Sequence, residues 1–246
     1  MNRLFDKAYR LPQHFTPLSI SGLVLWLDAS YITGLNDGDS INTELRDLSG
    51  NGYHATQSTA AQRPIYKVNI INSRPVVRFD AVDDNLVITN GGLLLRNKPG
   101  ATAFGVVLVN ASGTKRWLTI NTPTTTTRMI TNRSDFGYRI LDADAGVAVT
   151  GPALSNSTFY VVSCVFDALN ATGQSFRNGT AGTLVNGGTA GNTSDTTGSS
   201  SDIGWTSTLT IDGDLATVIL YDRALSTTER QRVERYLGSR YGITVS

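Results

Sequence analysis

The stretch "GDLATVILYDRALSTTERQRVERYLGSRYG", residues 213–242, decides the fold. Its first part is a run of β-branched and large apolar residues, which predicts a buried strand over 213–225. The second part begins with a capping-box pattern, Ser226 three residues before Glu229, and ends at Gly242. Between them three residues recur at four-residue spacing: Val233, Leu237 and Tyr241. The stretch therefore predicts a strand followed by a short helix that packs on this stripe.

Short runs of β-branched and aromatic residues fill the rest of the chain, each bounded by Gly, Asn, Asp or Pro. They cover 22–30, 75–81, 85–89, 103–110, 116–121, 136–142, 146–150, 158–168, 173–180 and 202–205. No helical pattern separates them, so the sequence predicts an all-β fold, a two-sheet antiparallel jelly-roll sandwich with one short C-terminal helix. Two low-complexity stretches, 121–128 and 186–202, hold few apolar residues and predict exposed loops.

The length and net charge of the chain limit the classes of protein to which it can belong. A chain of 246 residues suits one large β domain, which we expect over 19–246, preceded by an N-terminal arm over 1–18. The arm has no apolar core of the kind that a secretory signal carries. With 21 basic and 20 acidic residues, the chain has no net positive potential that would attract nucleic acid. No run approaches the roughly 18 consecutive apolar residues of a membrane span. The single cysteine, Cys164, lies in an apolar run and predicts a buried side chain.

Four segments resemble one family. They are "LVLWLDAS" (23–30), "RDLSGNGYHATQ" (46–57), "RPVVRFDAVDDNL" (74–86) and the terminal strand and helix (213–243). Together they are similar to the bacterial and phage branch of the concanavalin A-like lectin and glucanase superfamily, the laminin-G-like jelly rolls. The resemblance implies a sandwich of two curved sheets whose members usually act as binding or adhesion modules. The chain departs from the family at Thr217, where the last strand often carries a glutamate.

Carboxylates decide whether the chain is an enzyme, because some members of the wider superfamily cleave glycans. Retaining hydrolysis needs two carboxyl groups about 5 Å apart. The three glutamates, Glu44, Glu229 and Glu234, lie in a loop and in the terminal helix. Asp212 and Asp214 alternate as on one face of a strand, but the glycine between them favours a turn or bulge equally. We expect no catalytic activity.

The loop "DLSGNG", residues 47–52, has two interpretations. Asp47 with nearby carbonyl oxygens could hold a structural calcium ion, because calcium prefers such oxygen ligands. An aspartate can equally accept hydrogen bonds from the amides of its own turn, and Gly and Asn tolerate positive φ. We favour the turn and expect no required cofactor. Zinc is excluded because His14, His54 and Cys164 lack ligand spacing.

Exposed aromatic side chains are the usual platform for sugars in β-sandwiches. The ligand-binding candidates are Trp205, Trp117 and Tyr138, and each of them could pack in the core instead. Trp26 lies in an almost wholly apolar strand and predicts burial.

Two noncatalytic functions fit these observations. The first is a phage virion protein, a capsid decoration, cement or fibre component at the virion surface, whose arm contacts other virion proteins and which could form a trimer. The second is an extracellular or cell-surface module that binds a carbohydrate or mediates adhesion. A glycan hydrolase is a third hypothesis, which the carboxylates disfavour.

Overall fold

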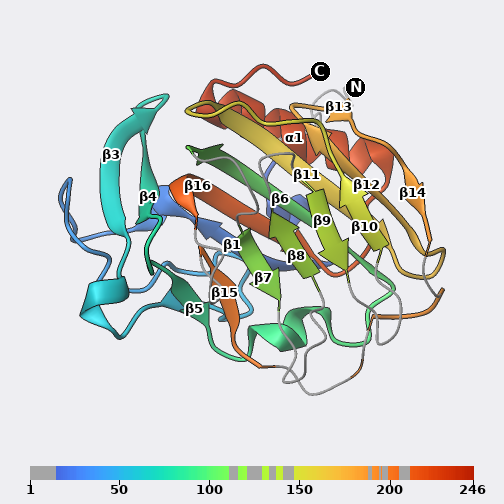
Figure 1. The fold of residues 1–246 in the computed structure, drawn as a ribbon, viewed down its shortest axis with the longest axis horizontal. Coiled ribbons are helices and arrows are strands. Elements are labelled where there is room, and N and C mark those ends of the chain that lie inside the picture. The colour runs from blue at the N-terminus through green and yellow to red at the C-terminus, as the bar shows by residue number, and fades with distance from the viewer. Residues whose placement is uncertain are drawn as a thin grey trace, which may run out of the picture.

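Two antiparallel sheets face one another, and a single long helix, α1 (Thr227–Tyr241), packs on the outer side of the larger sheet (Figure 1). The computed structural model describes residues 15–110, 116–120, 129–132, 137–140, 147–187, 190–193, 195, 199–204 and 211–246. Within these ranges no helix has both the length and the apolar character that crossing a bilayer requires. The expected all-β jelly-roll sandwich with a C-terminal helix is confirmed.

The larger sheet contains the long strands. Its order is β13 (Thr180–Ala181), β12 (Thr172–Arg177), β11 (Phe159–Asp167), β6 (Gly100–Val109), β16 (Asp212–Tyr221), β4 (Arg74–Asp80) and β3 (Ile65–Ile71). In addition, β1 (Leu23–Asp28) pairs with β16, and β14 (Val185–Asn186) pairs with β12. Segments far apart in the sequence therefore become neighbours, as expected for a jelly roll.

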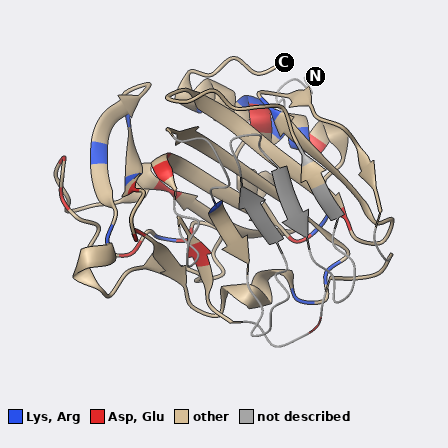
Figure 2. Ribbon diagram, in the orientation of Figure 1, with Lys and Arg blue, Asp and Glu red and all other residues tan. Residues whose placement is uncertain are grey.

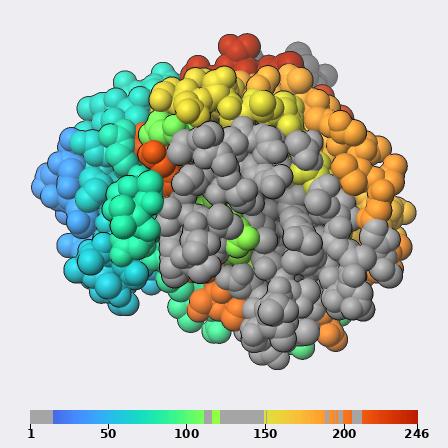
Figure 3. Space-filling model, in the orientation of Figure 1, coloured from blue at the N-terminus to red at the C-terminus, as the bar shows by residue number. Residues whose placement is uncertain are grey.

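The smaller sheet lies in front of the long strands in Figure 1. Its order is β10 (Val147–Thr150), β9 (Gly137–Ile140), β8 (Met129–Asn132), β7 (Arg116–Ile120), β15 (Ser201–Ile203), β5 (Leu86–Ile88) and β2 (Ala55–Thr56). Short 3-10 turns cover Pro17–Ser19, Ala29–Tyr31, Ala60–Gln62 and Gly91–Leu95. In the space-filling view, the atoms coloured from blue to blue-green gather at the left side of the molecule (Figure 3).

The strand predicted over 213–225 is β16, which ends at Tyr221 and occupies the middle of the larger sheet. Along one edge, β16 pairs with β6 over its length. Along the other edge, residues 212–215 pair with β4 and residues 217–221 pair with β1. The register shifts between Leu215 and Thr217, a β-bulge that bends the strand where one partner replaces the other. The sequence left open whether Gly213 forms a turn or bulge between Asp212 and Asp214. Gly213 instead pairs regularly with both neighbouring strands, and the bulge lies three residues further along.

Two hydrophobic clusters hold the layers together. The larger fills the space between the sheets and includes Leu27, Phe79, Leu118 and Cys164. The smaller joins the outer face of the larger sheet to α1. Burial of Trp26 and Cys164 is confirmed, and desolvation raises the pKa of the Cys164 thiol. Alternating side chains of one sheet therefore serve both clusters, which explains why its strands read as almost continuous apolar runs.

Helix α1 follows its sequence pattern closely. Ser226 accepts the amide of Glu229 while the Glu229 carboxylate accepts the amide of Ser226, and the helix ends at Gly242 with φ 68°. Val233, Leu237 and Tyr241 are buried in the smaller cluster, as predicted. The pKa of Glu229 falls to about 2, chiefly because Arg223 binds its carboxylate.

Some elements differ from the expectation. Strands β2, β8, β13 and β14 were not predicted, because each has four residues or fewer. Strand β3 was missed although Tyr66, Val68 and Ile70 alternate with polar residues. The stretch 186–202 was expected to be an exposed loop, but Thr193 and Ser201 are buried. Thr193 accepts the amide of Lys98 and donates to Leu95 O, so a polar segment covers the core by satisfying backbone groups. The other predicted loop, 121–128, lies outside the described residues.

Glu234 on α1 should be a stability determinant. Its side chain is 1% exposed and accepts hydrogen bonds from Arg230 and from Ser163 on β11. Glu234→Ala leaves the buried Arg230 guanidinium unpaired, so we expect the free energy of unfolding in denaturant to fall by about 3–5 kcal/mol.

The matched control replaces both partners, Arg230→Met with Glu234→Met, and should lose much less stability because no buried charge remains unpaired. A loss below about 1 kcal/mol for Glu234→Ala would contradict the assignment of a buried, coupled pair.

Candidate functional site

Of the three aromatic residues that were candidates for sugar binding, the structure describes the side chain of only Trp117. Trp117 is 3% exposed and points into the core between the sheets, where Gly105 of β6 leaves room for its ring. A ring in this position presents no face to a sugar. Tyr138 belongs to β9, of which the structure describes only the backbone, and Trp205 lies outside the described residues.

The "DLSGNG" loop is a hydrogen-bonded turn attached to β1. Asp47 Oδ1 accepts the amides of Trp26 (3.0 Å) and Ser49 (2.9 Å). Its Oδ2 accepts the hydroxyl of Ser49 (2.8 Å) and the amide of Tyr53 (3.1 Å). Gly50 and Gly52 have φ of 91° and 79°, the left-handed region that favours glycine. Both carboxylate oxygens therefore have protein donors, while a calcium ion at Asp47 stays a prediction.

The strand aspartates lie on one face, as their alternation suggested, but they do not form a pair. Asp214 makes a two-pronged contact with Arg78, at 2.7 Å from Nε and 2.8 Å from Nη2. Asp212 accepts a hydrogen bond from Asn110 Nδ2 (3.2 Å). Thr217, which stands where the resemblance implies a glutamate, is buried and donates to Leu27 O (2.7 Å), which joins β16 to β1.

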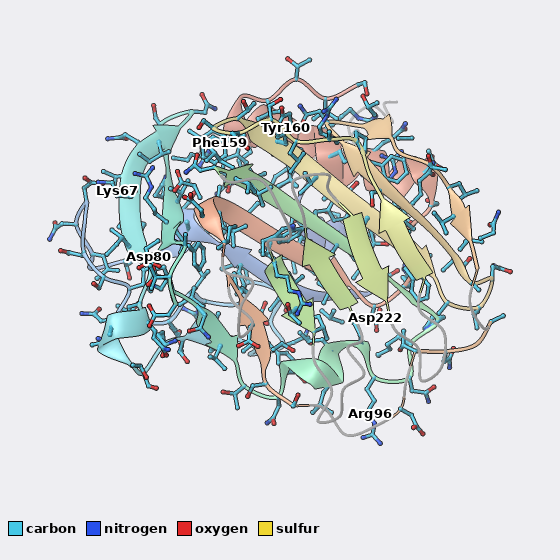
Figure 4. All side chains as sticks on the ribbon, in the orientation of Figure 1. Lys67, Asp80, Arg96, Phe159, Tyr160 and Asp222 are labelled. Atoms are coloured by element: carbon cyan, nitrogen blue, oxygen red, sulfur yellow. The ribbon has the colours of Figure 1, made fainter. Side chains whose placement is uncertain are left out.

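A group of three carboxylates follows β4. One oxygen each of Asp80, Asp83 and Asp84 lies within 4.8 Å of the others, and Figure 4 shows Asp80 at the end of that strand. Oxygen donors of this type could hold calcium, but exposed acidic groups also gather without an ion, and we assign none here. Burial of Asp84, together with the charges of Asp80 and Asp83, raises the pKa of Asp84 to about 6.

A basic hollow of about 540 Å³ lies beside α1. We call it the arginine hollow. It is lined by Phe15, Arg74, Arg232, Arg235, Tyr236, Ser239 and Arg240. No carboxylate is among these residues, and positions of basic residues on α1 are visible in Figure 2. Since the whole chain has a net charge of only +1, four arginines around one hollow are a local concentration of positive charge.

Helix geometry brings the arginines together. Arg232, Arg235 and Ser239 are spaced three and four residues apart, so they share one flank of α1, next to the stripe that enters the core. Arg74 reaches the same hollow from the start of β4, where its Nε donates to Arg240 O (2.8 Å) at the C-terminal end of the helix. This flank was missed, although the spacing of the arginines in "RVERYLGSR" carried the signal.

An ion pair with Asp28 fixes the position of Arg240. Its guanidinium pairs with the buried carboxylate of Asp28 (3.0 Å). Although burial acts against its charge, the Asp28 carboxylate raises the pKa of Arg240. The side chain of Arg240 also lies 5.8 Å from the ring centre of Tyr31. It therefore remains a fixed cation at the edge of the hollow.

Aromatic rings accompany these cations. Arg232 lies over the ring of Phe15 (4.8 Å), and Phe15 meets Tyr236 edge to face (5.9 Å). Tyr31 is 48% exposed and packs edge to face against Trp26. Tyr31 and Tyr236 are thus the accessible aromatic residues here, in place of the buried Trp117.

Removal of the Asp47 carboxylate should destabilise the protein. Asp47→Ala leaves the amides of Trp26, Ser49 and Tyr53 without their acceptor, so we expect a loss of about 2–4 kcal/mol in the free energy of unfolding. The control, Asp37→Ala, removes an exposed carboxylate that also accepts a backbone amide, and should destabilise the protein much less because solvent screens its contacts. Equal melting temperatures in calcium and in chelator support the turn, whereas a rise with calcium that Asp47→Ala abolishes would contradict it.

Asp84 should make stability depend on pH. Its pKa is raised in the folded state, so its contribution is present below the unfolded pKa of about 3.9 and is lost as pH rises through about 6. We expect Asp84→Asn to melt at a higher temperature than the parent above pH 6, with the difference shrinking toward pH 4. Asp195→Asn, at an exposed aspartate, is the control. A difference that is constant with pH would rule out the assignment.

Comparison with protein-family models and with curated proteins finds no match. Solved structures share the fold. Trypanosoma rangeli sialidase in complex with the inhibitor DANA gives a TM-score of 0.55 at 16% identity, over 92% of this chain and 34% of that chain. The binding domain of Paraclostridial Mosquitocidal Protein 1 gives 0.62 at 12% identity, over 89% and 52%.

The binding domain of botulinum neurotoxin serotype D gives 0.60 at 10% identity, over 91% of this chain and 54% of that chain. This chain therefore spans between a third and about half of the structures it matches. These likenesses establish the β-sandwich architecture, while the laminin-G-like branch stays a prediction.

Proposed function

We propose that this chain is a noncatalytic binding module of the laminin-G-like jelly-roll type, displayed at the surface of a larger assembly. In its specific form the assembly is a phage virion, in which the chain is a capsid decoration, cement or fibre component and residues 1–18 contact the neighbouring virion proteins. The sandwich supplies the displayed body, and the arm supplies the attachment.

The observation that carries the noncatalytic part is the state of the carboxylates. Asp214 is bound on both oxygens by Arg78, Glu234 by Arg230 and Ser163, and Glu229 by Arg223 and its capping amide. A retaining hydrolase needs two carboxyl groups that face one substrate across about 5 Å. Three of the five carboxylates that the sequence offered for this chemistry are thus committed to structural contacts, which supports binding over hydrolysis.

The end of the arm supports attachment. Phe15 packs against Tyr236 and beneath Arg232, and Tyr221 Oη donates to Pro17 O (2.9 Å). Residues 15 and 17 are therefore tied to α1 and to the central strand of the sheet. A partner that binds the preceding residues is thereby connected to the core of the domain, so the connection need not depend on a loose linker.

A carbohydrate-binding or adhesion module on a cell surface is the second candidate. It is favoured by the two structural neighbours whose names describe binding domains. It differs from the first candidate in requiring a glycan and in not requiring an assembled particle.

The arm can be tested directly. We expect the full-length chain to be present in many copies in purified particles, with residues 1–18 protected from protease in mass spectrometry. We also expect that removal of residues 1–14, with Phe15 kept, abolishes addition of the protein to particles that lack it. Thermal unfolding of the shortened chain is the control for folding.

Recovery of the chain only in a cell-envelope or secreted fraction would replace the virion assignment by the adhesion module. Glycan hydrolysis by the parent that is lost in the Asp212→Asn, Asp214→Asn double variant would contradict the noncatalytic assignment.

A further inference from the structure

We propose that the arginine hollow binds an acidic saccharide, a sugar chain carrying carboxylate or sulfate groups, with the anionic groups on Arg232 and Arg235 and a sugar face on the neighbouring tyrosines. This inference is independent of whether the chain is displayed on a virion or on a cell.

The charges of the lining residues point to an anion. Arg240 is neutralised by Asp28, and Arg74 is directed to the carbonyl at the end of α1. Arg232 and Arg235 are exposed, and no ion pair within the described part of the chain occupies either guanidinium. Arg232 and Arg235 lie three residues apart on one flank of α1, and guanidinium N–H donors suit the oxygens of carboxylate and sulfate groups.

Preorganisation strengthens the site. Tyr236 lines the hollow, and its ring makes edge-to-face contacts with Phe15 (5.9 Å) and Trp26 (6.4 Å). Arg232 is already oriented by the ring of Phe15. Side chains fixed before binding lose less conformational entropy when the ligand arrives.

The size and the aromatic residues point to a sugar. A volume of about 540 Å³ lies in the range of roughly 300–1,000 Å³ that small-molecule sites occupy, far more than a bare oxyanion fills. Tyr236 lines the hollow, and Tyr31 is exposed beside Arg240. A tyrosine ring provides an apolar face and a polar hydroxyl, which match the apolar C–H face and the hydroxyl groups of a sugar.

The charge of the protein's own N-terminal arm disfavours its binding in the arginine hollow. Residues 1–14 contain three basic side chains, Arg3, Lys7 and Arg10, against one acidic side chain, Asp6. A positively charged segment is repelled by a positively charged hollow, whereas an anionic ligand is attracted to both.

The test is calorimetric titration of the full chain with three hexasaccharides of matched length: a heparin-derived sulfated one, an oligogalacturonide and neutral maltohexaose. Inorganic phosphate is a fourth probe. We expect one or both acidic hexasaccharides to bind, with affinity that falls as salt is raised, and maltohexaose not to bind. Preference between the two acidic probes identifies sulfate or carboxylate as the recognised group.

The Arg232→Gln, Arg235→Gln double variant should weaken binding at least tenfold, the loss expected for a charge-assisted contact. Arg235→Gln alone should weaken it less and leaves the Phe15 contact of Arg232 intact. The control is Arg46→Gln with Arg96→Gln, two exposed arginines elsewhere, which removes the same charge and should leave affinity unchanged.

Three results would overturn the proposal: no binding of either acidic probe, equal loss in the control and the double variant, or phosphate binding as tightly as the hexasaccharides. The last would indicate a simple anion site.

Discussion

Pairing along β16 is the constraint on which the rest of the structure depends. This strand bonds to β6 along one edge and divides its other edge between β4 and β1. The bulge at Ala216, between Leu215 and Thr217, lets one strand serve two partners without breaking the ladder. The Thr217 hydroxyl adds a hydrogen bond from β16 to Leu27 O on β1. Without β16, β1 and β4 would lose the strand through which they join β6 in the larger sheet.

Position in this sheet also explains the division of roles among charged residues. Where the outer face of the sheet is covered by α1, charges are paired and buried, as Glu234 is with Arg230. At the flank of the helix, where the cover ends, Arg232 and Arg235 reach solvent. The same fifteen-residue helix therefore contributes a buried pair to stability on one side and an accessible cationic surface on the other.

The sequence predicted the elements whose local signals agree with their burial. Capping by Ser226 and Glu229, the stripe through Leu237 and the apolar run of β16 all depend on spacing within a few residues. The failures depend on distant contacts. Thr193 is buried because Lys98 and Leu95 need hydrogen-bond partners from another part of the chain, which composition cannot reveal. Trp117 packs in the core, as the alternative interpretation of this residue predicted, and Gly105 on the facing sheet makes room for its ring.

The arginine hollow illustrates the same limit of local pattern. The spacing of Arg232 and Arg235 on α1 was legible in the sequence, but Arg74 comes from a strand more than 150 residues earlier and Phe15 from the arm. Only the packing of α1 against β4 and the arm converts a charged helix face into a concave site. Because Phe15 belongs to the arm and also lines the hollow, the proposed attachment and the proposed ligand site share this residue. Under the two proposals, a partner that pulls on the arm would act on the position of Arg232, and a ligand at Arg232 would act on the arm in return, since such coupling is reciprocal.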